Sequence, residues 1–263
     1  MAGQKPTIKS PAEIELMRVA GSIVNAAHEA AAAVIRPGVT LAEIDAVVDD
    51  VIASGEAEPL FKGHSVPGVD PFPAAACISV NDEVVHGIPD GRNLVEGDIV
   101  SVDIGARYRG WCADAAVTWP VGKISDDRRR LLTVTEAALS EALRTLRAYV
   151  RWGEVATAIE TVVTAAGFTI LEDLVGHGIG REMWEAPHLP NHSRGGVNFV
   201  VVPGHVLAIE PMATITSRSV RHSSDGWMIA TADGKPAAHF EHTVAVTLNG
   251  IEVLTTGEKT WAQ

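Results

Sequence analysis

This 263-residue chain has few cysteines, and it lacks both long uninterrupted apolar runs and a signal-like segment in its first twenty residues. Only Cys77 and Cys112 are present, which excludes a disulfide framework and is typical of a protein kept in a reducing compartment. No apolar run is long enough to span a bilayer, and the first twenty residues mix charged with apolar side chains. We therefore expect a cytoplasmic protein that has no membrane partner.

Positive charge is also in short supply. The chain has 21 Lys and Arg residues against 33 Asp and Glu residues, for a formal net charge of −12. This balance argues against nucleic acid as the main partner, although surface charge can serve solubility alone. The hydrophobic fraction of 46% with 21% charged residues is that of an ordinary globular protein large enough to bury a core.

Two weakly similar halves, about 10–121 and 126–257, make up most of the chain. No low-complexity linker separates them, so we expect one domain over 1–263 with a shared core. A duplicated fold tends to place its repeated carboxylates on facing walls of one cleft, which suits a pair of divalent metal ions. A two-metal hydrolase is therefore the leading hypothesis. The matching segments are His86–Ile88 and His177–Ile179, Glu96–Asp103 and Pro203–Glu210, and Pro37–Val48 and Trp152–Val163.

Helix and strand patterns alternate in the same order in both halves. Ser10–Glu13 is a capping box that begins a helix ending near Ile35, and Thr40–Glu43 begins a second helix. Two more helices are expected over 126–150 and 152–166. The expected strands are 77–80, 83–85, 98–105, 111–119, 201–210, 227–230, 240–247 and 252–255. This order predicts an α+β fold with the strands gathered in one sheet.

Acidic residues occur on the predicted strands of the first half. The large aliphatic residues at alternate positions of 100–104 place Asp103 on the opposite face of its strand. With a turn at Tyr108-Arg109, Asp103 lies directly across from Asp114, with Cβ atoms about 4.5–5.5 Å apart. Carboxylates this close repel unless one is protonated or a cation lies between them. By itself the hairpin is equally compatible with one exposed turn acid and one strand-end acid.

The second half adds two more acids and a histidine. Glu210 ends the apolar run Val206–Ile209, and Glu241 begins another apolar run. A buried, unpaired carboxylate is costly, so these acids need compensating positive charge. His177, flanked by glycines, supplies a neutral nitrogen ligand. Four carboxylates and one imidazole suit two divalent ions such as Mn, Co, Fe or Zn.

Seven short motifs follow one another in order along the chain. They are Val84–Pro89, Val102-Asp103, Ala113-Asp114, Gly176–Gly180, Ala208–Met212, Asp225–Trp227 and Glu241–Thr243. Together they resemble the motifs of type I methionine aminopeptidases, from about Ile8 to Leu254. The resemblance implies the duplicated, pseudo-twofold pita-bread fold, with a central curved antiparallel sheet and helices outside. It also implies removal of the initiator methionine from nascent proteins.

Five metal ligands follow from this resemblance. Asp114 and Glu241 would bridge two divalent ions, Asp103 would chelate one of them, and His177 and Glu210 would hold the other. The ions would activate the attacking water by lowering its pKa. Glu210 would also act in catalysis by carrying the proton of that water toward the leaving amine.

The resemblance assigns further residues to the substrate. His86 would act in catalysis and substrate binding, by hydrogen-bonding the scissile amide or stabilising the tetrahedral intermediate. Cys77, Met183 and Trp227 match positions that line the methionine pocket, although plain core packing remains an alternative for each. The implied partners are nascent polypeptide N-termini, with a transient ribosome contact, and the implied state is a monomer. We expect the remaining histidines, apart from His188 and His242, to be surface or helix residues.

The chain departs from the family pattern at Trp184, which stands where the family carries a second catalytic histidine. An indole donates one hydrogen bond but cannot accept a proton. The loop 61–73 also lacks the tyrosines of the family; we align its His64 with a family histidine and its Phe72 with a tyrosine.

These departures keep other hypotheses open. One is a pita-bread paralogue with altered N-terminal residue specificity, or with reduced or no catalysis because of Trp184. A second is a proline-specific peptidase of the same fold, and a third is a binding protein that retains the metal site without turnover.

Overall fold

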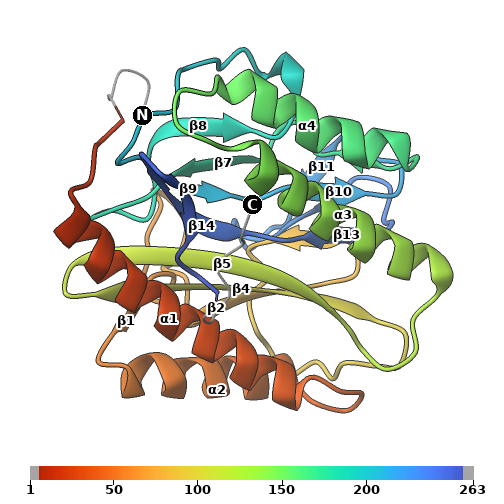
Figure 1. The fold of residues 1–263 in the computed structure, drawn as a ribbon. Helices are drawn as coiled ribbons and strands as arrows, with labels where there is room; N and C mark the ends of the chain where they lie inside the picture. Colours follow the sequence, from red (N-terminus) through yellow and green to blue (C-terminus); the bar gives the residue numbers. More distant parts are fainter. Residues whose placement is uncertain (1–5, 257–263) are drawn as a thin grey trace.

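The computed structural model describes residues 6–256, and Figure 1 shows its mixed arrangement of helices and antiparallel strands. The helices are α1 (Pro11–Val34), α2 (Leu41–Ser54), α3 (Asp126–Thr145), α4 (Trp152–Ala165) and the short 3₁₀ helix η1 (Ser193–Gly195). The strands of the first half are β1 (Glu58–Pro59), β2 (Ala76–Val80), β3 (Glu83–Val85), β4 (Ile99–Tyr108) and β5 (Trp111–Pro120). The strands of the second half are β6 (Thr169–Ile170), β7 (Val175–Gly178), β8 (Glu185–Pro190), β9 (Val206–Ile209), β10 (Met212–Thr214), β11 (Val220–His222), β12 (Ile229–Thr231), β13 (Ala237–His239), β14 (His242–Thr247) and β15 (Gly250–Val253). The predicted α+β class is confirmed, and the outer ends of the expected domain lie outside the described residues.

Both predicted capping boxes are present. The backbone N–H of Ser10 donates to the Glu13 carboxylate at 2.8 Å, and the Glu13 N–H donates back to the Ser10 hydroxyl at 3.4 Å. Thr40 and Glu43 repeat this arrangement at the start of α2. Each box satisfies two N–H groups that the first helical turn leaves without a partner. Local sequence therefore determines where these two helices begin.

Helix α3 is shorter than the sequence predicts. It ends at Thr145, whereas periodicity extended it to Val150. Tyr149 has a left-handed φ of 68°, and its N–H donates to the carbonyl of Val201 at 2.7 Å. Pairing with a distant segment therefore replaces the last helical turn.

The strands do not form one continuous hydrogen-bonded sheet. Hydrogen bonds divide them into a sheet around β4 and β5, a five-stranded sheet of order β15-β14-β9-β7-β8, and two three-stranded sheets. The two larger sheets meet where β5 passes β14 (Figure 1). There the Asp114 N–H donates to the Thr243 hydroxyl at 2.9 Å, and the Glu241 N–H donates to the Ala116 carbonyl at 2.8 Å. This seam joins the two halves of the chain.

Each helix pair covers its own half. Helix α1 packs against β4 and β5, α2 packs against α1, β1 and β2, and α3 and α4 pack together against strands of the second half (Figure 1). One apolar cluster draws on residues 20–121, and a second on residues 124–246 together with Ile99. Two further clusters draw on both halves; one contains Met17 and Val206, and the other contains Val84 and Met212. The two halves therefore share part of their apolar packing.

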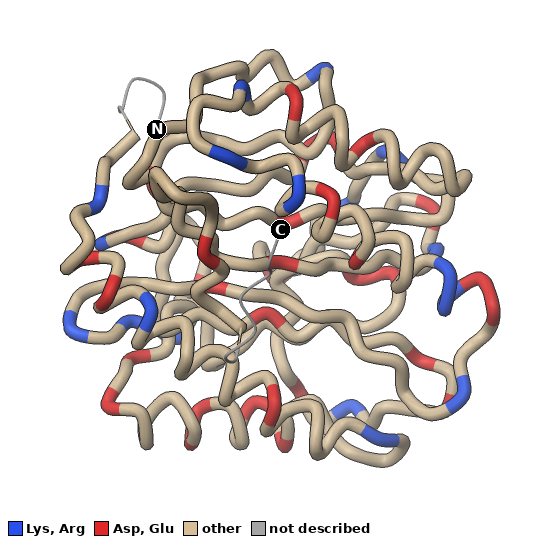
Figure 2. Tube along the Cα trace, in the orientation of Figure 1, with Lys and Arg blue, Asp and Glu red and all other residues tan. Residues whose placement is uncertain are grey.

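Charge is distributed unevenly over the trace. In Figure 2 the basic residues lie mainly toward the periphery, whereas acidic residues also occur near the centre, along the strands. Within residues 6–256, no helix combines the length and the apolar character needed to cross a membrane.

Candidate metal centre

The hairpin of β4 and β5 brings Asp103 and Asp114 to one face of the sheet, but not as a direct pair. Asp103 is opposite Ala116, and Asp114 is opposite Gly105. The predicted direct pairing is wrong because the turn lies at Arg109-Gly110, one residue later than expected. Both turn residues have positive φ, 48° and 80°, which is the geometry of a two-residue hairpin turn. The two acids are therefore diagonal neighbours on the same face.

The remaining predicted ligands approach from the second half. His177 lies in β7, Glu210 directly follows β9, and Glu241 directly precedes β14. Ligand atoms of Asp114, His177 and Glu241 all lie within 4.8 Å of one another. The Nε2 atom of His177 is 3.6 Å from a carboxylate oxygen of Glu210. The structure thus brings residues from four different segments to one buried place.

The electrostatics of this place favour a bound cation. Burial, reinforced by the neighbouring carboxylates, raises the pKa of Asp103, Glu210 and Glu241 well above the usual range. Burial raises the pKa of Asp114 to about 7. One oxygen each of Asp103, Asp114 and Glu241 is buried without a hydrogen-bond partner within the described chain. Buried carboxylate oxygens that lack donors are the donor set that divalent ions require, so the residues fit the expected metal site.

The ring of His177 is oriented for ligation. Its Nδ1 is 2.9 Å from the carbonyl of Gly178, which assigns the ring proton to Nδ1. The Nε2 lone pair then faces Glu210. Burial lowers the pKa of His177 to about 4, so the imidazole is neutral at pH 7 and able to bind a metal ion.

His239 belongs to the same place, although the sequence analysis did not single it out. Its Nε2 is 3.4 Å from a Glu210 oxygen and 4.0 Å from a Glu241 oxygen, and its side chain is 2% exposed. The expectation that it is a surface or helix residue is therefore wrong. The spacing His239-Phe240-Glu241 could have revealed it, because residues two apart on an extended chain share a face.

His86 lies at the edge of the centre, directly after β3. It has a left-handed φ of 58°, and the following Gly87 packs so closely that a Cβ there would be 2.3 Å from the Ile78 carbonyl oxygen. Such a conformation costs on the order of 1–3 kcal/mol and persists only where its surroundings enforce it. Burial lowers the pKa of His86 to about 4, so its ring is neutral at pH 7.

Trp184 lies between two histidines. Its ring centroid is 4.7 Å from that of His64 and 6.4 Å from that of His177, edge-on in both cases. The segment that carries it is anchored by Glu185, which accepts from the Arg181 N–H at 2.8 Å and pairs with Lys9 at 2.7 Å. The indole therefore occupies the space beside His177.

The other predicted pocket residues share one apolar cluster. Cys77, Met183 and Trp227 are all buried within it, together with Phe61 and Phe72 of the 61–73 loop. Burial raises the pKa of the Cys77 thiol well above its usual range, so the side chain is a neutral, apolar wall. The loop packs onto this wall: the Phe72 and Trp227 rings are 5.4 Å apart.

A cavity of about 240 Å³ opens beside the centre. Its lining includes His86, His177, Trp184 and Glu210. The catalytic candidates His86 and Glu210 thus face the same cavity as Trp184, the residue that departs from the family pattern. The cavity is large enough for a side chain and the adjoining peptide group.

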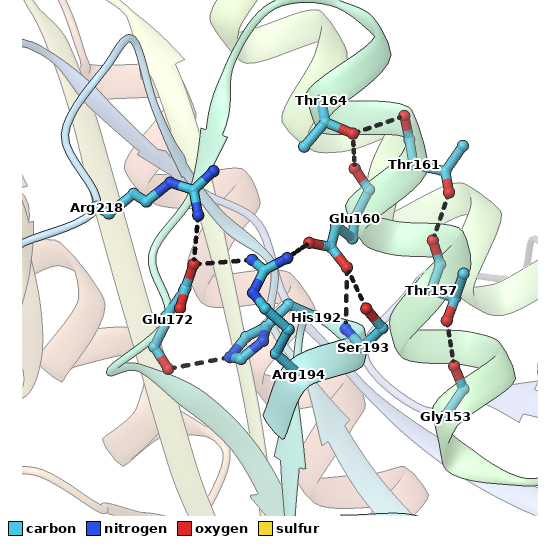
Figure 3. A network of polar contacts seen from close by, with 10 residues as sticks. All are labelled: Gly153, Thr157, Glu160, Thr161, Thr164, Glu172, His192, Ser193, Arg194 and Arg218. Atoms are coloured by element: carbon cyan, nitrogen blue, oxygen red, sulfur yellow. Dashed lines mark hydrogen bonds and ion pairs between the residues drawn. The ribbon is translucent and has the colours of Figure 1, made fainter. Parts of the chain in front are cut away.

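A polar network joins α4, Glu172 and η1 in the second half (Figure 3). Arg194 of η1 pairs with Glu160 of α4 at 2.6 Å and with Glu172 at 2.8 Å. Three residues before Arg194, the buried Asn191 donates to the Glu210 carbonyl at 3.0 Å. The network ties helix α4 to the segment that holds the backbone of Glu210.

The chain matches the family model described as metallopeptidase family M24 over residues 15–248. The chain belongs to this family. Methionine aminopeptidase 1 of Bacillus subtilis is 42% identical over 247 residues, which cover 94% of this chain and 98% of that protein. Methionine aminopeptidase 1 of Mycobacterium tuberculosis is 41% identical over 256 residues, with 95% and 94% covered. Membership of metallopeptidase family M24 implies divalent metal ions, and the clustered side chains are candidate ligands for them.

Solved structures of M24 enzymes have the same fold. The methionine aminopeptidase of Thermotoga maritima superposes with a TM-score of 0.92 and 40% identity, covering 96% of this chain and all of that one. Prolidase from Pyrococcus furiosus superposes with a TM-score of 0.76 at 23% identity, covering 96% of this chain and 66% of that one. The predicted pita-bread fold is confirmed, and the prolidase likeness concerns the fold alone.

The metal-free protein is expected to lose stability as pH rises from about 7.5 to 8.5. Below this window, six buried histidines with lowered pKa change the stability with pH in the opposite direction to the carboxylates. They are His28, His86, His177, His205, His239 and His242. Above about pH 7.5, a full unit above the ordinary histidine pKa, these rings are neutral in both the folded and the unfolded state. The unfolded carboxyls are then already ionised, whereas in the folded state burial raises the pKa of Asp114 to about 7 and the pKa of Asp103, Glu210 and Glu241 well above the usual range. Folded protein therefore binds more protons than unfolded protein, and its stability falls with pH.

Thermal unfolding of chelator-treated protein across this window measures the effect. Saturating Mn²⁺ or Co²⁺ is expected to raise Tm, and to raise it more at about pH 8.5 than at about pH 7.5. A Tm of the metal-free protein that rises with pH across the window would contradict this reading of the carboxylates.

Proposed function

We propose that this chain is a metal-dependent methionine aminopeptidase that removes the initiator methionine from nascent proteins. The observation that carries the proposal is the convergence of acids from both halves with His177 beside a 240 Å³ cavity. Identity above 40% to methionine aminopeptidases over nearly the whole chain supports the same activity. The alternatives of a proline-specific peptidase or an inactive paralogue are not favoured.

The ligand set in this proposal consists of Asp103, Asp114, His177, Glu210 and Glu241, holding two divalent ions chosen from Mn, Co, Fe and Zn. When bound, such ions lower the pKa of water toward neutrality and polarise a carbonyl group. Asp114 and Glu241, the two carboxylates at the seam, would be shared by both ions. The raised pKa of each acid in the metal-free protein supports this assignment, because cation binding relieves their mutual repulsion.

Protein groups carry the proton and orient the peptide. Glu210 takes the proton of the attacking water and passes it to the leaving amine, and its position on the cavity wall supports this role. His86, which is neutral at pH 7, donates a hydrogen bond to the scissile amide or to the oxygen that becomes negative in the tetrahedral intermediate. The enforced backbone conformation of His86 supports a functional position.

The methionine side chain enters toward the wall formed by Cys77, Met183 and Trp227. Sulfur and aromatic surfaces suit a thioether, and all three side chains are buried in one cluster. Trp184 lines the 240 Å³ cavity beside the centre and would contact the substrate there.

The proposal extends to how the protein works in the cell. One catalytic domain, formed from both halves, acts as a cytoplasmic monomer on polypeptide N-termini, with transient contact to the ribosome. The seam between β5 and β14 supports joint action of the halves, because residues from both sides of it form the centre.

Hydrolysis of a Met-Ala-Ser peptide tests the activity. Purified protein with added Mn²⁺ or Co²⁺ is expected to release free methionine, and a chelator is expected to abolish the release. A peptide that begins with leucine serves as the specificity control. Protein that binds metal ions but releases no methionine would contradict the proposed function.

A further inference from the structure

His239 is a buried polar side chain that the ligand set above does not use. Its side chain is 2% exposed, and neither ring nitrogen has a hydrogen-bond partner within the described chain. Buried polar groups without partners are rare and call for an explanation. Its Nε2 lies 3.4 Å from a carboxylate oxygen of Glu210 and 4.0 Å from one of Glu241.

The backbone of His239 is held firmly against the first half. Its N–H donates to the Thr118 hydroxyl at 2.8 Å, and the same hydroxyl lies 2.8 Å from the His239 carbonyl oxygen, to which it donates. Ser101 is also 2.8 Å from this hydroxyl. Strand β13 pairs with β10, which begins two residues after Glu210. The ring of His239 therefore enters the centre from a rigid frame.

We propose that His239 is an additional nitrogen ligand of the metal centre, on the side formed by Glu210 and Glu241. This inference rests on the proposed metallopeptidase function. Ligand atoms of these three residues lie within 4.8 Å of one another, as they do for Asp114, His177 and Glu241. The two clusters share Glu241, so His239 reaches the same buried group of ligand atoms as His177.

The distances match shared coordination. Two ligands that are each about 2.1 Å from one ion at a tetrahedral angle are about 3.4 Å apart. His239 Nε2 is 3.4 Å from Glu210, and His177 Nε2 is 3.6 Å from the other oxygen of Glu210. The absence of a hydrogen bond from His239 to Glu210, at this close approach, favours a cation between them over a direct proton bridge.

A second imidazole changes which ions the centre prefers. Imidazole suits Zn, Co, Fe and Ni, whereas a site of carboxylates and water suits Mg and Mn. With His177 and His239 both contributing nitrogen, the centre is expected to favour Zn²⁺ or Co²⁺ over Mn²⁺ more strongly than a site with one histidine.

X-ray absorption of the zinc-loaded protein counts imidazole ligands directly, without reference to turnover. With two zinc ions bound, we expect about one imidazole per zinc in the wild-type protein and about half that number in His239→Gln. Competition titrations are expected to show Zn²⁺ and Co²⁺ affinity falling by about 10–100-fold in this variant, with little change for Mn²⁺.

His239→Gln separates ligation from positioning, because glutamine still donates a hydrogen bond to Glu210 but provides no imidazole nitrogen. Unchanged affinities in this variant, or half an imidazole per zinc in the wild-type protein, would overturn the proposal. His205→Gln is the matched control: His205 is also buried, but it packs against Phe199 and accepts from the Val202 N–H. The wild-type imidazole count decides the question even if the His239 variant folds poorly. Failure of the wild-type protein to bind zinc at all would instead overturn the proposed function.

Discussion

Glu241→Gln is expected to abolish aminopeptidase turnover and, at the same time, to raise the Tm of the metal-free protein at pH 8. Turnover falls because an amide is a poor bridging ligand for two divalent ions. We expect a loss in kcat/KM of more than about 10²-fold. Even mutation of residues that only hydrogen-bond to metal ligands typically lowers metal affinity or activity by about 10–100-fold. The side chain is buried at the seam between the halves, where water cannot replace it.

Stability changes in the opposite direction for an electrostatic reason. Burial, then Asp114, Glu210 and Asp103, raise the pKa of Glu241 well above its usual range. At pH 8 the ionised side chain is therefore unfavourable in the folded, metal-free protein. A neutral amide of the same size removes that repulsion, as often happens when a functional group is replaced at a strained site.

The two effects are measured by peptide hydrolysis with Co²⁺ and by thermal unfolding with chelator. Glu58→Gln, on the exposed part of β1, is the control and should change neither quantity. Retained turnover in Glu241→Gln would remove this residue from the ligand set. A lower Tm at pH 8 would show that the carboxylate is satisfied by protein groups instead of a cation.

Trp184→His is expected to raise turnover on Met-Ala peptides by about 10²-fold, the lower end of what a positioned acid–base group contributes. Trp184 lines the cavity with His86 and Glu210, so a histidine there reaches the same space. An indole donates one hydrogen bond and cannot accept a proton, whereas an imidazole does both.

The structure also indicates a cost of this substitution. The Trp184 ring contacts His64 of the 61–73 loop and faces His177. A smaller ring at position 184 therefore leaves His64 less well packed. We expect a lower Tm together with the higher kcat. Trp184→Phe is the matched control, because it keeps an aromatic ring without any polar atom and should not raise kcat. An equal or lower kcat in Trp184→His would mean that the indole is the better partner in this chain.

Much of the fold could be predicted because the relevant information is local. Capping boxes at Ser10 and Thr40 mark helix starts through bonds that span three residues. Alternation along β4 placed Asp103 on the face away from the aliphatic side chains, as the structure confirms. The hairpin register was missed because Arg109, a residue that rarely adopts positive φ, occupies the first turn position.

The identity of the acids, the duplicated order of elements and the family motifs were determined by the sequence alone, since each depends on neighbours along the chain. Only the tertiary structure decided that His239 joins Glu210 and Glu241, and that His64 of a distant loop packs on Trp184. Those contacts join segments that are brought together by the pairing of whole strands. No periodicity within one segment specifies which side chains of another segment it will meet.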